Sequence, residues 1–323
     1  MPWLNGRVWA APEGGKFVTR VDQTVPFMKT VCGILAEYGI TSGLVGLDAC
    51  PSFYVYEDAF KKAGFQVVDA VRTMFRARSI KNEDELACVR YACQAADAAF
   101  AAIQRAIRPG VRECDLQGLG MEALYQLGAD ETMDFVVASG PRTAPLHIDF
   151  TDRIIRPGDY VVVDINGNSF QGYKSCYYRT FICGTANDEQ KEGFEVARKM
   201  MYDGMATMKP GNTTDDFLEA WPKDPAFWGV DDTSNLGGYA LAHGLGLSLH
   251  EYPQFGVGGP KGGRPPCVTF EKGMVMAVET YFGDRNQKRR AYGTRLEECV
   301  AITDDGYERL TNYPVGEIIE CPL

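Results

Sequence analysis

The alternation of apolar and polar positions separates a short first segment, residues 1–75, from a longer remainder. Within it the pattern predicts two helices, at 25–40 and 56–64, and two short strands, at 43–49 and 65–70. This α/β unit is about half the size of an ordinary mononucleotide-binding domain, and its isolated glycines do not form a phosphate-binding fingerprint. We interpret it as a remnant of a larger domain or as an accessory domain.

The remainder, residues 76–323, opens with a long helix and then mixes strands with helices. Asn82 and three acidic residues suit the start of that helix, and Pro109-Gly110 ends it. Further helices are predicted at 113–127 and 187–208, and strands at 136–141, 159–166, 177–184, 273–280 and 294–303. Because no regular βαβ rhythm is present, the pattern indicates an α+β fold rather than a doubly wound sheet.

Length and charge narrow the possible functions. A chain of 323 residues suggests two domains, or one large domain with an attachment. With 33 Lys and Arg against 43 Asp and Glu, the net charge of -10 argues against nucleic acid as a partner. No apolar run approaches the roughly 18 residues that span a bilayer, and the first fifteen residues lack signal-peptide features. We therefore expect no membrane partner and a cytoplasmic location.

The cysteines and histidines differ in what they indicate. The ten cysteines are scattered without a CxxC pair, so most should be reduced, buried thiols. The chain has only three histidines, His147, His243 and His250.

Three carboxylates stand in predicted strands where the pattern favours apolar residues: Asp164, Glu279 and Glu297. Buried carboxylates are costly unless they are paired or bind a metal. A salt bridge to Arg179 or Arg295 would account for any one of them. Three such strands together with the two histidines of HGLGLSLHEYP (243–253) favour an oxygen-rich site with an imidazole, which suits Mn, Fe, Co or Zn.

Five motifs, in order, resemble the pita-bread family of creatinase, prolidase (Xaa-Pro dipeptidase) and aminopeptidase P. They are SGPRTAPLH (139–147), RPGDYVVVDINGNSFQGYKSCYYRTFICG (156–184), HGLGLSLHEYP (243–253), EKGMVMAVE (271–279) and GTRLEECVAIT (293–303). The resemblance implies an α+β pita-bread catalytic domain over 76–323, with a pseudo-twofold curved sheet around the site. Residues 1–75 resemble a shortened form of the family's N-terminal domain.

The resemblance also implies a set of metal ligands, with one departure. The family's order Asp, Asp, His, Glu, Glu falls here on Asp164, Cys176, His243, Glu279 and Glu297. A thiol in place of the second aspartate loses a bridging carboxylate, so we expect at most one divalent ion, or none. The segment between Asp164 and Gly172 is also one residue longer than in the peptidases. Asn166 either adds a carbonyl ligand or caps a turn.

The same comparison assigns roles around the reaction. Glu279 would exchange a proton with the attacking water, and His147 and His250 would stabilise the oxyanion. Without metal, a histidine would act as the base, as in creatinase. Three further residues are candidates for substrate contacts, with ion pairing or core packing as their alternative roles: Arg142, Tyr173 and Arg295.

The expected activity is hydrolysis of a C–N bond in a short peptide or small molecule, of the Xaa-Pro peptidase type. Three alternatives stay open: a metal-free creatinase-like amidinohydrolase, a dimethylsulfoniopropionate-type lyase of the same fold, and a non-catalytic binding module. Retention of all three histidines argues against the last. We also expect a homodimer, because the first helix has an apolar face to bury: Val25, Met28, Val31, Ile34 and Leu35.

Overall fold

The computed structural model describes residues 20–48, 53–144, 149–228, 241–257, 267–283 and 292–323. Contacts divide the chain into two compact units, Met1–Ala77 and Arg78–Leu323. This division falls two residues after the predicted boundary at 75.

The first unit is a small α/β structure. Its elements are α1 (Arg20–Glu37), β1 (Gly43–Leu47), α2 (Phe53–Lys62), β2 (Phe65–Asp69) and α3 (Val71–Ala77). The two strands are parallel, with Gly43 opposite Phe65. Met28, Phe60 and Phe65 form the centre of its core, and the α1 side chains Val31 and Leu35 pack against them.

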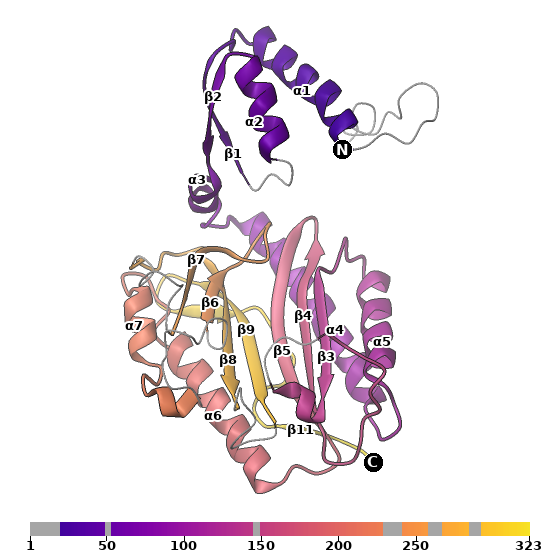
Figure 1. Ribbon diagram of the computed structural model, residues 1–323. Helices are drawn as coiled ribbons and strands as arrows, with labels where there is room; N and C mark the ends of the chain where they lie inside the picture. The colour runs from indigo at the N-terminus through magenta and orange to yellow at the C-terminus, as the bar shows by residue number, and fades with distance from the viewer. Residues whose placement is uncertain (1–19, 49–52, 145–148, 229–240, 258–266, 284–291) are drawn as a thin grey trace. The chain divides into compact units, whose positions relative to one another are not determined.

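The second unit holds two sheets and their helices (Figure 1). The helices are α4 (Glu83–Ala106), α5 (Glu113–Gln126), η1 (Gly140–Thr143), α6 (Asp188–Met205), α7 (Thr214–Glu219) and η2 (Pro225–Trp228). The strands are β3 (Asp134–Ser139), β4 (Tyr160–Phe170), β5 (Tyr173–Cys183), β6 (Leu241–Gly244), β7 (Glu251–Gly256), β8 (Val275–Phe282), β9 (Thr294–Ile302), β10 (Tyr307–Arg309) and β11 (Ile319–Cys321). One sheet has the order β11-β5-β4-β3 and the other β10-β9-β8-β6-β7.

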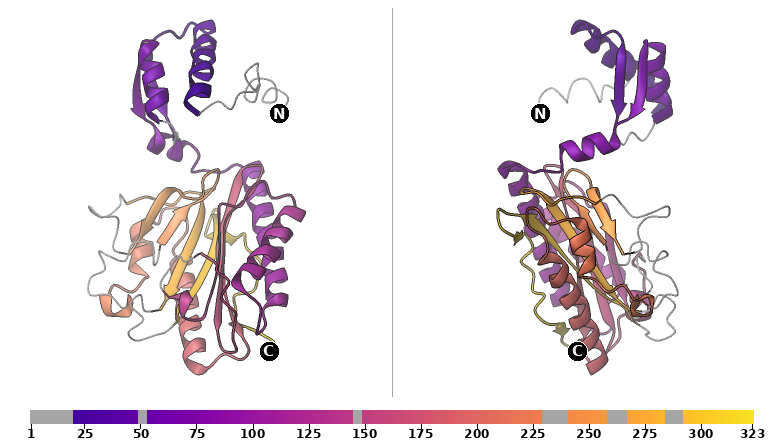
Figure 2. Two further views of the ribbon diagram at one scale, coloured as in Figure 1. Left: turned by 45° about the vertical axis from the view of Figure 1, so that its right-hand side comes forward. Right: turned by 90° about the vertical axis from the view of Figure 1, so that its left-hand side faces the viewer.

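The two sheets meet where β5 and β9 lie side by side (Figures 1 and 2). Thr180 Oγ1 donates to Arg295 O at 2.7 Å and accepts from Arg295 N at 3.0 Å. Arg179 Nη1 donates to the carbonyl of Glu297 at 2.7 Å. These side-chain bonds replace a strand ladder at the junction and hold the two halves in register.

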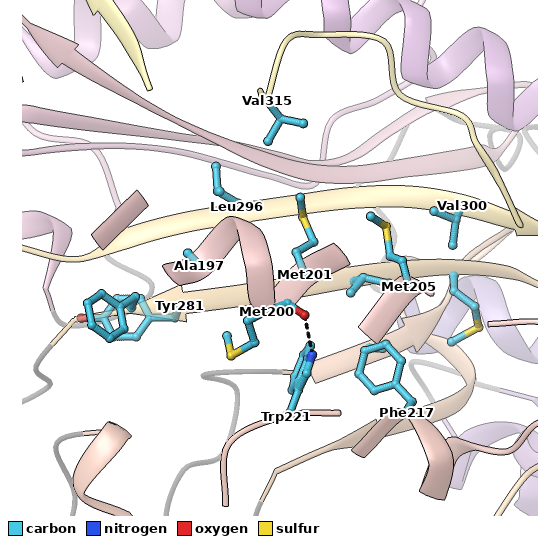
Figure 3. Packing of buried hydrophobic residues seen from close by; sticks show 14 of the residues in the cluster. Ala197, Met200, Met201, Met205, Phe217, Trp221, Tyr281, Leu296, Val300 and Val315 are labelled. Atoms are coloured by element: carbon cyan, nitrogen blue, oxygen red, sulfur yellow. Dashed lines mark hydrogen bonds between the residues drawn. The ribbon is translucent and has the colours of Figure 1, made fainter. Parts of the chain in front are cut away.

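Each half covers one face of its sheet with helices. Apolar residues of α4 and α5 pack on the alternate positions of β4 that hold Val163 and Ile165. On the other side, α6 and α7 pack on β8 and β9 through Met200, Met201 and Phe217, with Trp221 Nε1 donating to Met200 O (Figure 3). The opposite sheet face is therefore free to carry polar groups.

The predicted elements agree with the structure except at a few bounds. α4 begins after a capping box between Asn82 and Glu85, as the acidic start indicated. β4 and β5 are longer than predicted because they form one hairpin, closed by Gln171 and Gly172 with φ of 52° and 82°. Two consecutive positive φ values are typical of the tight turn that joins twisted strands.

Within the described ranges, one helix, α4, is long and apolar enough to cross a membrane by length and composition alone. Half of the most apolar 18-residue stretch of this helix is buried, and Val89, Phe100 and Ile103 are fully enclosed. Here α4 is a core helix packed on the β3–β5 sheet.

Candidate metal centre and active site

Polar residues gather on the sheet face that the helices leave uncovered. On β9, Leu296 and Val300 join the α6 core, so Glu297 between them points to the other face. The same alternation turns Asp164 away from Val163 and Ile165 on β4. The strands that carry the predicted ligands are the central ones in Figure 1: β4, β5, β6, β8 and β9.

A histidine and two glutamates form the centre of this face. Glu279 on β8 lies directly opposite Glu297 on β9, and β6 places His243 next to β8. His243 Nε2 is 3.3 Å from Glu279 Oε1 and 3.9 Å from Glu297 Oε1. Like charges directly opposite in a ladder are destabilising. A cation or a proton between the two glutamates would remove this repulsion.

The tautomer of His243 is set by its own turn. Its Nδ1 lies 2.9 Å from the carbonyl oxygen of Gly244. Since a carbonyl only accepts, Nδ1 carries the hydrogen, and Nε2, which faces the glutamates, is left to bind either a proton or a metal cation.

Besides the N–H donor Arg295 Nε, four buried atoms of this cluster have no hydrogen-bond partner within the described part of the chain: Asp164 Oδ1, His243 Nε2, Glu297 Oε1 and Glu297 Oε2. Each such atom costs about 1–3 kcal/mol if it stays unpaired. All four are electron-pair donors, so their common missing partner is a proton or a metal cation.

Asp164, Asn166 and Cys176 form a second group beside the first, linked by two hydrogen bonds that leave Asp164 Oδ1 unpaired. Asn166 Nδ2 donates to Asp164 Oδ2 at 2.7 Å, and Cys176 Sγ donates to Asn166 Oδ1 at 2.7 Å. Asn166 lies directly opposite Cys176 in the hairpin. It is therefore inside a strand and caps no turn, contrary to one of its two predicted roles.

Arg295 and Tyr178 complete the cluster. The buried Arg295 guanidinium lies 3.7 Å from Glu279 and 4.0 Å from Asp164, with its Cζ 3.8 Å from the centre of the Tyr178 ring. The Tyr178 hydroxyl donates to Glu279 Oε2. Arg295 thus supplies the positive charge that the carboxylates share, as one sequence alternative expected.

Arg179, the other arginine considered for such a bridge, lies on the opposite face. Its guanidinium pairs with Glu298 at 2.9 Å and reaches none of the three site carboxylates through an ion pair. Sequence alternation could have shown this. Arg179 directly follows Tyr178, and successive residues of a strand point to opposite faces of the sheet.

Burial and charge set the protonation of the site. Burial, with the charge of Glu279 added, raises the pKa of Asp164 and of Glu297 well above that of an ordinary carboxyl group. Burial alone would also raise the pKa of Glu279, but His243 and then Arg295 bring it below the ordinary value. Burial and the nearby glutamates raise the pKa of the Cys176 thiol as well.

The donor atoms fit a single cation. Two sets of three residues bring one ligand atom each within 4.8 Å of one another: Cys176, His243 and Glu297, and His243, His250 and Glu279. Both sets share His243. A thiol, an imidazole and a carboxylate are together a donor set suited to Zn or Fe rather than Mg or Ca.

The remaining predicted residues lie at different places. The ring of His250 is exposed, with its centre 4.2 Å from that of His243. His147 falls outside the described residues. Arg142 pairs with the buried Glu113 at 3.3 Å and donates to Asp149 O, while the Tyr173 hydroxyl donates to Glu85 at 2.7 Å. Neither Arg142 nor Tyr173 is joined to the cluster by these contacts.

Sequence reasoning missed a buried ion-pair group under the segment that carries His250. Glu251 Oε2 lies 3.0 Å from Lys81 Nζ, and its Oε1 lies 2.7 Å from Arg78 Nε and accepts from Ser248 N at 3.0 Å. The signal was available: two cations precede α4, and a carboxylate directly follows His250 at the start of β7. Tyr178, two positions beyond Cys176, was also not assigned to the site.

Fold and site define a hydrolase of the metallopeptidase type. The sequence model of metallopeptidase family M24 matches residues 87–304, well over half of the chain, and the chain belongs to this family. The predicted family and the pita-bread fold are thereby confirmed.

Several relatives support the same placement. The chain is 31% identical to an uncharacterized peptidase, YqhT, of Bacillus subtilis over 79% of its own length and 68% of that protein. It is 29% identical to a Xaa-Pro dipeptidase of Pyrococcus horikoshii over 83% and 72% of the two chains. Among solved structures, a Xaa-Pro dipeptidase from Bacillus anthracis matches with a TM-score of 0.74 and 27% identity, covering 91% of this chain and 78% of the other.

Proposed function

We propose that the protein hydrolyses short peptides at an Xaa-Pro bond, using one divalent cation held by His243, Glu297 and Cys176. The single observation that carries this is the convergence of unpaired buried donor atoms of His243 and Glu297. Its relatives include Xaa-Pro dipeptidases, which supports proline-containing dipeptides as the first substrates to test.

Each residue has a separate task in this proposal. When bound, a divalent ion would supply Lewis-acid chemistry, lowering the pKa of a water and polarising the scissile carbonyl. Glu279, whose pKa is lowered, is ionised and able to accept a proton from the nucleophile and return it to the leaving amine. The exposed His250 ring beside His243 is suited to donate a hydrogen bond to the oxyanion.

The test combines metal analysis with hydrolysis. Protein purified without added metal is analysed for its elements and assayed on an Xaa-Pro dipeptide, with the matched Xaa-Ala dipeptide as a control for specificity. We expect about one equivalent of Zn or Fe, loss of hydrolysis with chelator, and recovery on adding the metal. Hydrolysis of Xaa-Ala alone, or of neither dipeptide in the metal-loaded protein, would reject the proposal.

A metal-free, creatinase-like amidinohydrolase is the second candidate. It is favoured by the raised pKa of Cys176, since a protonated thiol is not a metal ligand, and by the positive charge of Arg295 between Asp164 and Glu279. Activity on creatine-like guanidinium compounds that survives exhaustive chelation would select it over the peptidase.

We further propose that the protein acts in the cytoplasm as a homodimer. The first unit offers exposed apolar side chains for such an interface, including Phe27 and Ile34 on α1.

A further inference from the structure

The one-residue insertion in the β4–β5 hairpin forms a β-bulge. Asn166 pairs with Cys176, and the next pair is Asn168 with Ser175, so Gly167 is the extra residue. Its φ is +67°, and a Cβ there would come within 2.8 Å of the Met133 side chain, so the position requires glycine. The bulge interrupts the regular ladder between the Asn166–Cys176 and Asn168–Ser175 pairs.

This register places the Asn166 amide between two of the expected ligands. Asp164 and Asn166 share a face of β4, and Cys176 and Tyr178 share the facing side of β5. The amide nitrogen holds Asp164 and the amide oxygen holds the thiol, each at 2.7 Å. Asn166 is 3% exposed and Asp164 is fully buried, so both hydrogen bonds of the amide lie inside the protein.

We infer that Asn166 fills the position where a second cation would bridge Asp164 and residue 176, and thereby fixes the centre at one ion. The inference rests on the proposed function, because it concerns the metal centre of that site. A neutral amide binds a carboxylate by donation without adding charge, whereas a cation there would stand close to the first ion and to Arg295. The ion would then be confined to the side of His243 and Glu297.

Asn166 is consequently a residue that determines how many ions the site binds. The cysteine in place of the family's aspartate at position 176 explains only half of the difference from a two-ion site. In a Cys176→Asp protein the amide keeps two N–H groups, enough to donate to both carboxylates at once. A carboxylate at 176 alone should therefore not open the second position. Removal of the amide is required as well.

The experiment measures Mn²⁺ equivalents by equilibrium dialysis and elemental analysis. Four proteins are compared: the wild type, Asn166→Ala, Cys176→Asp and the double variant Asn166→Ala/Cys176→Asp. We expect about one equivalent in the first three and two in the double variant. Two equivalents in Cys176→Asp alone, or one in the double variant, would overturn the inference.

A matched control uses the other buried amide of the hairpin. Asn168 donates to Ala92 O at 2.7 Å, away from the ligands, so Asn168→Ala/Cys176→Asp should stay at one equivalent. Two equivalents there would mean that any loosening of the hairpin opens the site, which contradicts a specific role for Asn166. If the alanine double variant does not fold, Asn166→Ser/Cys176→Asp replaces it with the same expected two equivalents.

The proposed peptidase function and the role of Asn166 are tested by different measurements. Dipeptide hydrolysis by the wild type tests the peptidase, while the stoichiometry of the variants tests Asn166. A protein that shows the expected Mn²⁺ pattern but hydrolyses no dipeptide rejects only the proposed substrate. A protein that hydrolyses Xaa-Pro but takes two Mn²⁺ as wild type rejects only the role of Asn166.

Discussion

His243 illustrates how one residue gains its role from its neighbours. Its Nδ1 donates to the carbonyl of Gly244, so Nε2 is the ring nitrogen that faces Glu279 and Glu297 and binds a proton or a cation there. The sequence marked His243 through its motif, but the tautomer depends on a turn that a pattern does not describe.

Replacing His243 should therefore weaken metal binding strongly. Loss of an outer partner of a ligand typically costs about 10–100-fold in metal affinity, and we expect His243→Ala to cost at least that. Competition with a chromophoric chelator measures it. Glu192→Gln, an exposed carboxylate on α6, is the control and should leave the affinity unchanged.

Protonation gives a second prediction at this scale. Because burial raises their pKa values, the Cys176 thiol is protonated at neutral pH without metal and Glu297 keeps its proton to higher pH than an ordinary carboxyl group, so a cation must displace these protons. We expect metal binding to release about one proton or more, and the apparent affinity to rise with pH. Calorimetry in buffers of different ionisation enthalpy would show no buffer dependence if these groups were already ionised.

At the scale of an element, α5 shows how neighbouring glycines differ. Gly118 is exposed and a Cβ there would meet nothing within 4 Å, whereas a Cβ at the buried Gly120 would strike the Phe135 ring and lie 2.9 Å from Ile103 Cδ1. The helical pattern predicted α5, but only packing separates these two positions.

The two substitutions should change stability in opposite directions. We expect Gly118→Ala to stabilise by about 0.5–1 kcal/mol through helix propensity, and Gly120→Ala to destabilise by about 1–3 kcal/mol through overpacking. Urea unfolding of both variants measures the free energies. Equal effects would show that the helix can shift away from β3.

The buried group around Glu251 allows a third test of an element, the start of β7. Glu251→Gln would leave Lys81 and Arg78 without a charged partner, and breaking such a buried pair costs about 3–5 kcal/mol. The exposed pair of Lys272 and Asp304 is the control, since Asp304→Asn should cost no more than about 1 kcal/mol. A small loss at Glu251 in denaturant unfolding would mean that water enters this site.

At the scale of the molecule, the sequence predicted class, family and most strands, because alternation and motif order are local properties. It could not place Arg142, since Glu113, 29 residues earlier, captures that guanidinium through tertiary packing. Nor could it show that the extra hairpin residue would bring Asn166 opposite Cys176, because the position of a bulge follows from both strands together.

The assembly is also a property at this scale. Exposed apolar side chains on α1 predict association, and light scattering at micromolar concentration should give twice the chain mass of 35.7 kDa. A double charge substitution, Phe27→Glu/Ile34→Glu, should yield monomers, while Lys29→Glu on the same helix serves as the charge control. A monomeric wild type would contradict the homodimer.

Arg179 has a mechanical consequence. It joins β5 to the backbone of β9 and to the carbonyls of Tyr313 and Pro314 near the C-terminal end, while its charge is matched by Glu298. If either sheet detached, the buried Arg179 guanidinium would lose its partners. A buried charge without partners is very unfavourable. The two halves should therefore melt together as one cooperative block, and the ligands that they contribute separately stay in alignment until the whole domain opens.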